Sequence, residues 1–429
     1  MHRLTINNLG PIDECELTCR PFMVLTGEQA SGKSTVAKAL YYFRTVKDDV
    51  YTVVESRAFD FQQQNISIQK MLVDMLRRKF VKTFGPLWGG EENNMLLNYC
   101  YAEDCWINIR LTHKPLPNYV YIELSPSLKN FLREHEHALT DTPTGIPELQ
   151  KRRFQRELRE FFNDDYETIY IPAGRSMLTL LSQNLSYLYK TMDEPQRRML
   201  DYCTQKYIET ILTIKPEFSE GLDGIMAYYG TRRKIPEAWT SALALIDKVL
   251  CGTYKVEDGE ERILLKNGNY VKINFASSGQ QDAVWIMNLL FYYLVQDRPA
   301  MFIIEEPESH LFPSSQKYIM EFISLVCNQG HSVLVTTHSP YVLGALNNLL
   351  YAAQFRRTGR QEEAAKVIPL SLWLDAGKFS AYFVKGGKVE DCIDHEMNLI
   401  DNGRIDEISG VINHEYDRLF ELEEDDAAR

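Results

Sequence analysis

The stretch "PFMVLTGEQASGKSTVAKALYYF", residues 21–43, decides the fold that this sequence predicts. The apolar run "FMVLT" has the composition of a strand, and "STVAKALYYF" has the spacing of a helix with apolar residues on one face. Between them the pattern Gly-x-x-x-x-Gly-Lys-Ser, residues 27–34, is typical of a loop whose backbone N–H groups surround nucleotide phosphates while the lysine neutralises their charge. The following helix N-terminus adds unpaired N–H groups and the positive end of a dipole.

A strand-to-helix turn that binds nothing is the alternative, and the order strand, turn, helix makes it the weaker one. We therefore predict a phosphate-binding loop. The residues expected to contact the nucleotide are Gly27, Glu28, Gln29, Ala30, Ser31, Gly32, Lys33, Ser34 and Thr35.

Length and composition bound the class of protein. With 429 residues the chain exceeds the length at which one core stays efficient, so two or three lobes are expected. Hydrophobic residues make up 45% and charged residues 25% of the chain, which is ordinary for a soluble protein. The sequence shows no apolar run of bilayer length and no signal-peptide pattern, so a cytoplasmic protein without membrane association is expected.

Cysteine usage and charge narrow the class further. The eight cysteines are scattered and lack partners at the spacing of a zinc site, so reduced thiols are expected. A formal net charge of −12 argues against a protein that coats nucleic acid non-specifically, although it allows a local basic groove. The densest basic stretch, residues 148–162, has helical periodicity and is expected to be a solvated helix face rather than a phosphate-binding stripe.

Strand and helix patterns alternate along the rest of the chain. Two strands are expected around Gly10-Pro11, and an antiparallel hairpin from "CWINIRLTH" and "YVYIELS". Residues 127–244 are mostly helical in pattern, with the short β-like run "TIYIPAGR" among them. Strand signals return around the turn Asn267-Gly268, and helices then alternate with the apolar runs "MFII" and "VLVTT". This alternation predicts an α/β fold with a mainly parallel sheet.

Two carboxylates and one histidine follow the last two apolar strands. Glu305 and Glu306 stand at the carboxyl end of "MFII", in a strand expected beside that of the phosphate loop. Glu305 and the Ser34 hydroxyl would hold Mg²⁺, and Glu306 would take the proton of the water that attacks the γ-phosphate. His338 ends the next strand, where an imidazole can donate a hydrogen bond to the γ-phosphate. A purely structural histidine is the alternative, and the presence of the other parts in order favours the catalytic role.

A second helix N-terminus that can bind an anion opens at "FASSGQQDAVWIMNLL". Together with the phosphate loop, "FIIEEPESHLFP" and "TTHSP", it resembles the ABC-type ATPases of the SMC, RecF and OLD group. In that family a Leu-Ser-Gly-Gly-Gln signature from one subunit closes over ATP held by the other, and Ser278 and Gly279 take the signature positions. "EEPESHLFP" and "SSGQQ" are similar to the ATPase subunits of bacterial anti-phage systems such as Septu and PARIS. The resemblance implies ATP and Mg²⁺ as ligands and a head-to-tail dimer.

The resemblance also implies an ABC-type P-loop ATPase head, with a mainly parallel sheet core, an antiparallel β subdomain and a helical insertion. The insertion between Lys33 and Ser278 is too long for a simple transporter ATPase and lacks the heptads of a long coiled coil. Four regions are expected: the head with the loop and β subdomain in 1–125, a mainly helical insertion in 126–260, the head with the signature and catalytic strands in 261–345, and a mixed C-terminal region in 346–429.

Several positions depart from the family pattern. The usual asparagine and glycine of the loop are Gln29 and Ala30, and the usual magnesium-side aspartate is Glu305, whose longer side chain would slow turnover. A histidine often found before the proline of the "EEPE" segment is Phe312. The glutamine loop of the family is not evident, and Arg175 in "YIPAGRS" is the candidate in its place for sensing nucleotide or DNA.

Three functions remain open on this basis. The first is an ATPase subunit that senses phage or DNA and controls a separate effector, such as an HNH or Toprim nuclease, in a defence complex. The second is a RecF-like DNA-repair ATPase, and the third is an ATP-bound scaffold with negligible turnover. The segment after His338 shows no acidic arrangement of the Toprim kind, so nuclease activity in this chain is not expected.

Overall fold

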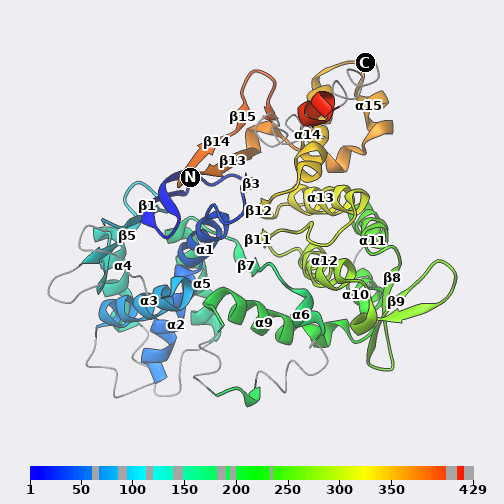
Figure 1. The fold of residues 1–429 in the computed structure, drawn as a ribbon. Coiled ribbons are helices and arrows are strands. Elements are labelled where there is room, and N and C mark those ends of the chain that lie inside the picture. The colour runs from blue at the N-terminus through cyan, green and yellow to red at the C-terminus, as the bar shows by residue number, and fades with distance from the viewer. Residues whose placement is uncertain are drawn as a thin grey trace.

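The computed structural model describes residues 1–59, 67–85, 94–112, 119–138, 148–180, 190–193, 200–231, 235–401 and 413–419. One large mixed sheet runs through these residues, and the N-terminal and C-terminal halves of the chain lie largely on opposite sides of its central strands (Figure 1). None of the helices in these ranges has the length and apolarity of a membrane span.

The described residues form an 11-stranded sheet in the order β6-β5-β4-β1-β2-β14-β13-β3-β12-β11-β7. Its strands are β1 (Arg3–Leu9), β2 (Ile12–Thr18), β3 (Phe22–Gly27), β4 (Leu96–Cys100), β5 (Trp106–Thr112), β6 (Tyr119–Leu124), β7 (Glu167–Ile171), β11 (Ala300–Glu305), β12 (Ser332–Thr337), β13 (Phe379–Lys385) and β14 (Lys388–Asp391). A three-stranded sheet contains β8 (Thr253–Glu257), β9 (Glu260–Leu264) and β10 (Tyr270–Lys272). A two-stranded sheet contains β15 (Ile393–Asp394) and β16 (Leu399–Ile400).

Helices connect these strands. The α-helices are α1 (Lys33–Arg44), α2 (Val46–Phe59), α3 (Ile68–Phe84), α4 (Pro126–Ala138), α5 (Glu148–Phe162), α6 (Ser176–Leu180), α9 (Tyr202–Ile214), α10 (Gly221–Gly230), α11 (Glu237–Leu250), α12 (Ser278–Gln296), α13 (Pro313–Asn328), α14 (Pro340–Gln354) and α15 (Gln361–Val367). Short 3-10 helices are η2 (Lys215–Phe218), η3 (Ile273–Phe275), η4 (Phe355–Arg357), η5 (Leu370–Leu372) and η6 (Ala376–Lys378).

The central strands separate two hydrophobic cores. Phe22 and Val24 of β3 belong to the core that includes helices α9 to α14, whereas Met23 and Leu25 belong to the core built on α1 to α5. Successive strand side chains point to opposite faces, so a strand covered on both faces must be apolar throughout. Every residue of β11 and β12 is buried for this reason; β11 is apolar up to Glu305, and the centre of β12 is the apolar run 333–335.

The predicted fold class is confirmed. Strands β13, β3, β12, β11 and β7 are parallel in this order, and β1, β2, β4, β5 and β6 form antiparallel pairs. The strand pair around Gly10, the hairpin of β5 and β6, and the turn at Asn267-Gly268 between β9 and β10 are confirmed as well. The boundaries of the four expected regions stay predictions.

Two pairings of distant strands were not predicted: β12 lies between β3 and β11, and β13 pairs with β3. The strand of Glu305 was expected beside the phosphate-loop strand, and this prediction is wrong, because β12 lies between β3 and β11. Two strand spacings, about 10 Å, therefore separate β3 from β11. Strand β13, from the expected C-terminal region, pairs with β3 on its other side. Both pairings join segments that are far apart in the chain, which local periodicity does not encode.

Two smaller expectations concern the cysteines and the basic stretch, and the expectation that this stretch does not bind phosphate stays a prediction. All eight cysteines are free thiols. Helix α5, the basic stretch, buries Phe154, Leu158 and Phe162 against the core and exposes most of its arginines. Among the described residues no group of three His, Cys, Asp or Glu side chains could hold a metal ion by itself.

The close pairing of β13 with β3 predicts that Gly27 tolerates no side chain. A Cβ atom on Gly27 would lie 2.2 Å from the carbonyl oxygen of Val384, at a φ of 141° that other residues rarely adopt. We expect Gly27→Ala to lower the free energy of unfolding by about 2 kcal/mol or more in chemical denaturation. Gly344→Ala in α14 is the control, because its Cβ would meet nothing within 4 Å. A Gly27→Ala protein as stable as the parent would contradict this packing.

Candidate active site

The phosphate loop joins β3 to α1 at the carboxyl edge of the parallel strands. Its backbone takes positive φ angles at Gly27 (141°), Ala30 (59°) and Gly32 (108°). Gly32 caps α1 without a side-chain hydrogen bond, so the first N–H groups of the helix can bind an anion. The left-handed conformation costs alanine about 1 kcal/mol, so Ala30 is a strained position. The predicted contacts Glu28, Gln29, Ala30 and Ser31 lie in this loop, and Lys33, Ser34 and Thr35 open α1.

Lys33 is folded back over the loop. It is 5% exposed, and its Nζ donates hydrogen bonds to the carbonyl oxygens of Gly27 (3.0 Å) and Glu28 (2.7 Å). Burial lowers the pKa of Lys33 to about 8, and the nearby carboxylates, those of Glu306 and Glu308 foremost, act in the opposite direction. The loop thus holds an amine between carbonyl oxygens at the point where the motif predicts phosphate charge.

His338 follows β12 and bridges the loop to Glu306. Its Nδ1 lies 2.9 Å from the carbonyl oxygen of Gly27 and 3.2 Å from Nζ of Lys33. Its Nε2 lies 3.1 Å from Oε1 of Glu306. The sequence assigned His338 and Glu306 to one phosphate group, and the structure brings the two side chains into direct contact.

Glu306 follows β11 directly. Its φ of 42° is rare for a residue other than glycine, and its N–H donates to the carbonyl oxygen of Thr336 at 2.9 Å. Strained backbone of this kind concentrates at functional sites. The hydrogen bond from His338 lowers the pKa of Glu306, so its carboxylate is ionised near neutral pH and can accept a proton.

Glu305, the last residue of β11, fits a magnesium ligand. It is 5% exposed, and its Oε2 accepts a hydrogen bond from the N–H of Ala173 at 3.1 Å. Its Oε1 is buried and makes no well-aligned hydrogen bond among the described residues, although the hydroxyl of Tyr170 lies close to the same carboxylate. A buried carboxylate oxygen without a well-aligned hydrogen bond is costly unless a cation neutralises it, and Mg²⁺ prefers such oxygen ligands together with a hydroxyl such as that of Ser34.

Residues 1–343 match the family model described as AAA ATPase domain, a range that includes the loop, both carboxylates and the histidine. The chain belongs to the AAA ATPase domain family. No curated protein matches it.

Three solved structures resemble this AAA ATPase in outline, each at 10% sequence identity over 91% of this chain. They are the SMC head domain from Thermotoga maritima (TM-score 0.38, 97% of that chain), the Smc head domain with an extended coiled coil bound to the C-terminal domain of ScpA derived from Pyrococcus furiosus (TM-score 0.41, 96%), and the SmcHead bound to the C-winged helix domain of ScpA (TM-score 0.40, 96%).

Glu308 holds the histidine of this AAA ATPase in place, a role that the sequence analysis did not assign. It is 8% exposed, and its Oε1 accepts hydrogen bonds from Oγ1 of Thr337 (2.5 Å) and from the N–H of His338 (3.1 Å). Burial raises the pKa of Glu308. The available signal was the third carboxylate of "EEPE", which follows a buried strand closely enough to reach the end of the next one.

Arg175 positions the backbone at the edge of the sheet that carries the candidate active site. It is 0% exposed, and its guanidinium donates to the carbonyl oxygens of Pro172 (2.6 Å), Glu305 (2.6 Å), Glu306 (2.9 Å) and Asp282 (3.2 Å). The side chain has no exposed surface for direct contact with DNA, and the hypothesis that Arg175 senses nucleotide stays a prediction. Arg175 ties together the segment after β7, the end of β11 and the first turns of α12.

The signature residues Ser278 and Gly279 begin α12. Ser278 is exposed, whereas Gly279 is buried, and a Cβ on Gly279 would lie 2.5 Å from the carbonyl oxygen of His310. Nδ1 of His310 also lies 2.6 Å from Oδ2 of Asp282 in the same helix. Helix α12 is thus fixed to the loop that follows Glu305 and Glu306. The nucleotide-binding role of Ser278 and Gly279 stays a prediction.

The bonds of Glu308 predict that two substitutions behave differently. Glu308→Gln keeps an oxygen that accepts from Thr337 and His338, so the rate of ATP hydrolysis should stay within about twofold of the parent. Glu308→Leu leaves both donors unpaired, so the rate should fall about tenfold or more while ATP affinity changes little. Steady-state assays and nucleotide titrations measure both quantities. Equal rates in the two variants would show that Glu308 does not act through His338.

Proposed function

We propose that this chain binds ATP with Mg²⁺ and hydrolyses it to ADP and phosphate, with each ATP enclosed between two copies of the head. The observation that carries the proposal is the contact of His338 with Lys33 of the loop on one side and with Glu306 on the other, at 3.2 Å and 3.1 Å. Phosphate binding and proton transfer thereby share one edge of the sheet, as hydrolysis requires.

Each residue at this edge has one role in the proposal. The loop N–H groups and Lys33 bind the phosphates, and Ser34 and Glu305 would hold Mg²⁺, which supplies positive charge next to the phosphates. Glu306 orients the attacking water and takes its proton. His338 donates a hydrogen bond toward the γ-phosphate and, through its contact with Glu306, links the presence of that phosphate to the position of the base.

The surface around the site supports a second copy as the partner. Ser278 is exposed beside Phe275, which is 81% exposed. Phe312, which begins the turn into α13 after the catalytic carboxylates, is 75% exposed, and Tyr341, near the start of α14, is 58% exposed. Phe275, Phe312 and Tyr341 are close in the chain to motif residues, so they are the side chains that we expect an interface between two copies to cover. A head-to-tail dimer would cover them while bringing each signature to the other copy's loop.

The biological role is proposed on the motif resemblance alone. We propose that ATP-driven closure of two heads controls a separate effector, such as an HNH or Toprim nuclease, in an anti-phage defence complex. Copurification of a nuclease encoded by a neighbouring gene would support this role. Tight, ATP-dependent binding of gapped DNA by the isolated chain would favour a RecF-like repair ATPase instead, and unmeasurable turnover would favour a scaffold.

Glu306→Gln should bind ATP as tightly as the parent and stop hydrolysis. An amide can hold the water but cannot take its proton, so turnover should fall by about a hundredfold or more. Lys33→Ala is the matched loss-of-binding variant, because it removes the motif's cation from the phosphates. Fluorescent-nucleotide titration and phosphate release measure the two effects. Parental hydrolysis by Glu306→Gln would mean that the base has been misassigned.

Mixing two inactive variants tests whether the site is shared between copies. Ser278→Arg should block the signature and Lys33→Ala the loop. In a head-to-tail dimer of the two, one site carries both defects and the other carries neither, so ATPase activity should partly return. Such recovery requires that one intact site turns over alone. No recovery, together with a mass of Glu306→Gln in light scattering that ATP does not change, would rule out the shared site.

A further inference from the structure

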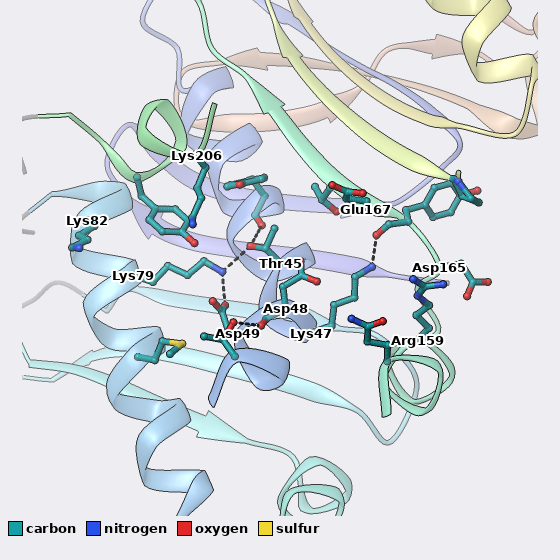
Figure 2. A pocket seen from close by; sticks show the side chains of 18 of the residues that line it. Thr45, Lys47, Asp48, Asp49, Lys79, Lys82, Arg159, Asp165, Glu167 and Lys206 are labelled. Carbon is teal, nitrogen blue, oxygen red and sulfur yellow. Dashed lines mark hydrogen bonds and ion pairs between the residues drawn. The ribbon is translucent and has the colours of Figure 1, made fainter. Parts of the chain in front are cut away.

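A cavity of about 690 Å³ lies at the end of the sheet opposite the candidate active site. Tyr41 and Thr45 at the end of α1, Glu167 and Thr168 at the start of β7, and Pro299 just before β11 all line it (Figure 2). Since α1 has 12 residues and begins at the phosphate loop, the cavity lies about 18 Å from that loop. A molecule in the cavity is therefore separate from the ATP at the active site.

Positive charge is concentrated in this cavity, although the chain as a whole carries −12. The lining cations outnumber the lining carboxylates by three. The cations are Lys47, Arg78, Lys79, Lys82, Arg159, Lys206 and Arg298, and the carboxylates are Asp48, Asp49, Asp165 and Glu167.

Some of these cations are already paired with carboxylates of the protein. Nζ of Lys79 donates to Oγ1 of Thr45 (2.7 Å) and to Oδ2 of Asp49 (2.5 Å), and Lys79 is buried. Arg298 pairs with Glu167 at 3.0 Å. Each of these two pairs is neutral and forms part of the wall. Two further lining cations are paired with carboxylates outside the lining, Lys47 with Asp164 (3.1 Å) and Lys206 with Glu209 (2.8 Å).

Three other lining cations are not paired with a carboxylate of the described residues. Arg78 and Lys82 on α3 and Arg159 on α5 are exposed, and none of them has an ion pair or side-chain hydrogen bond within the described part of the chain. Figure 2 shows Lys82 on one side of the cavity, near Lys79 and Lys206, and Arg159 on the other. Cations from two helices thus face one hollow from two sides, where an anionic ligand could contact both.

The two lining carboxylates outside those pairs, Asp48 and Asp165, repel a bound anion less than the free cations attract it. Asp48 opens to the cavity, yet the surrounding protein desolvates it and raises its pKa to about 6, so it is neutralised more readily than an ordinary aspartate. Asp165 lies on the same side of the view as Arg159 in Figure 2. The balance that remains is positive.

We propose that this cavity binds a small molecule that carries phosphate groups. Its volume falls in the range of small-ligand sites, about 300 to 1,000 Å³. Lysine and arginine form their strongest hydrogen bonds with phosphate oxygens, and arginine can do so with two N–H groups at once. A continuous nucleic-acid backbone fits less well, because it prefers an unbroken basic stripe and carboxylates are interspersed among these cations.

Inorganic tripolyphosphate is the probe, added to the full chain with Lys33→Ala so that the phosphate loop does not compete. Calorimetric titration at low ionic strength should show about one bound tripolyphosphate per chain, with weaker binding as salt is added. Replacing Arg78, Lys82 and Arg159 by glutamate in this background should weaken binding by about tenfold or more.

The control replaces Lys70, Arg152 and Arg156 by glutamate, which makes the same charge change on the same two helices outside the cavity. It should bind tripolyphosphate as the Lys33→Ala protein does. If thermal unfolding shows that the triple cavity variant is not folded, Lys82→Glu is compared with Lys70→Glu. The proposal is overturned if tripolyphosphate does not bind, if control and cavity variants weaken equally, or if only a short single-stranded DNA binds.

Discussion

The parallel pairing of β12 between β3 and β11 is the constraint on which the candidate active site depends. In this register Thr337 lies opposite Thr26, and Glu305 lies opposite Thr336. The residues that follow these strands, among them His338, therefore emerge at one edge within hydrogen-bond reach of one another. A slip of one residue would turn every side chain of β12 to the other face of the sheet and separate the histidine from the loop.

The edge also concentrates buried charge. Glu305, Glu308 and Asp282 each keep one buried carboxylate oxygen without a well-aligned hydrogen bond among the described residues. The fully buried guanidinium of Arg175 lies among them, and burial lowers its pKa. Unpaired buried oxygens lower the free energy of unfolding. A bound cation and nucleotide would raise it again by interacting with these groups. Lower stability of the unliganded protein is expected at a site that is shaped for binding.

Local patterns predicted much of the fold, and long-range pairings account for what they missed. The phosphate loop follows from glycine spacing between an apolar strand and a helix, and the β5 and β6 hairpin from alternation, because both are encoded within a few residues. The place of β12 and the pairing of β13 with β3 depend on segments hundreds of residues apart, about which periodicity says nothing. For the same reason the sequence indicated Glu306, the proposed base, but not Glu308, whose partners Thr337 and His338 lie at the end of the next strand. The sequence indicated Arg175 only as a candidate in the place of the glutamine loop, and its burial and its bonds to four carbonyl oxygens show that it positions backbone.

The most direct test of the central claim is a structure of the Glu306→Gln protein with ATP and Mg²⁺. The account predicts that Nζ of Lys33 leaves the carbonyl oxygens of Gly27 and Glu28 for the phosphates, and that Ser278 of a second copy reaches the γ-phosphate. A single head that encloses ATP with its own residues alone, or a Lys33 still bound to the loop carbonyls, would contradict it.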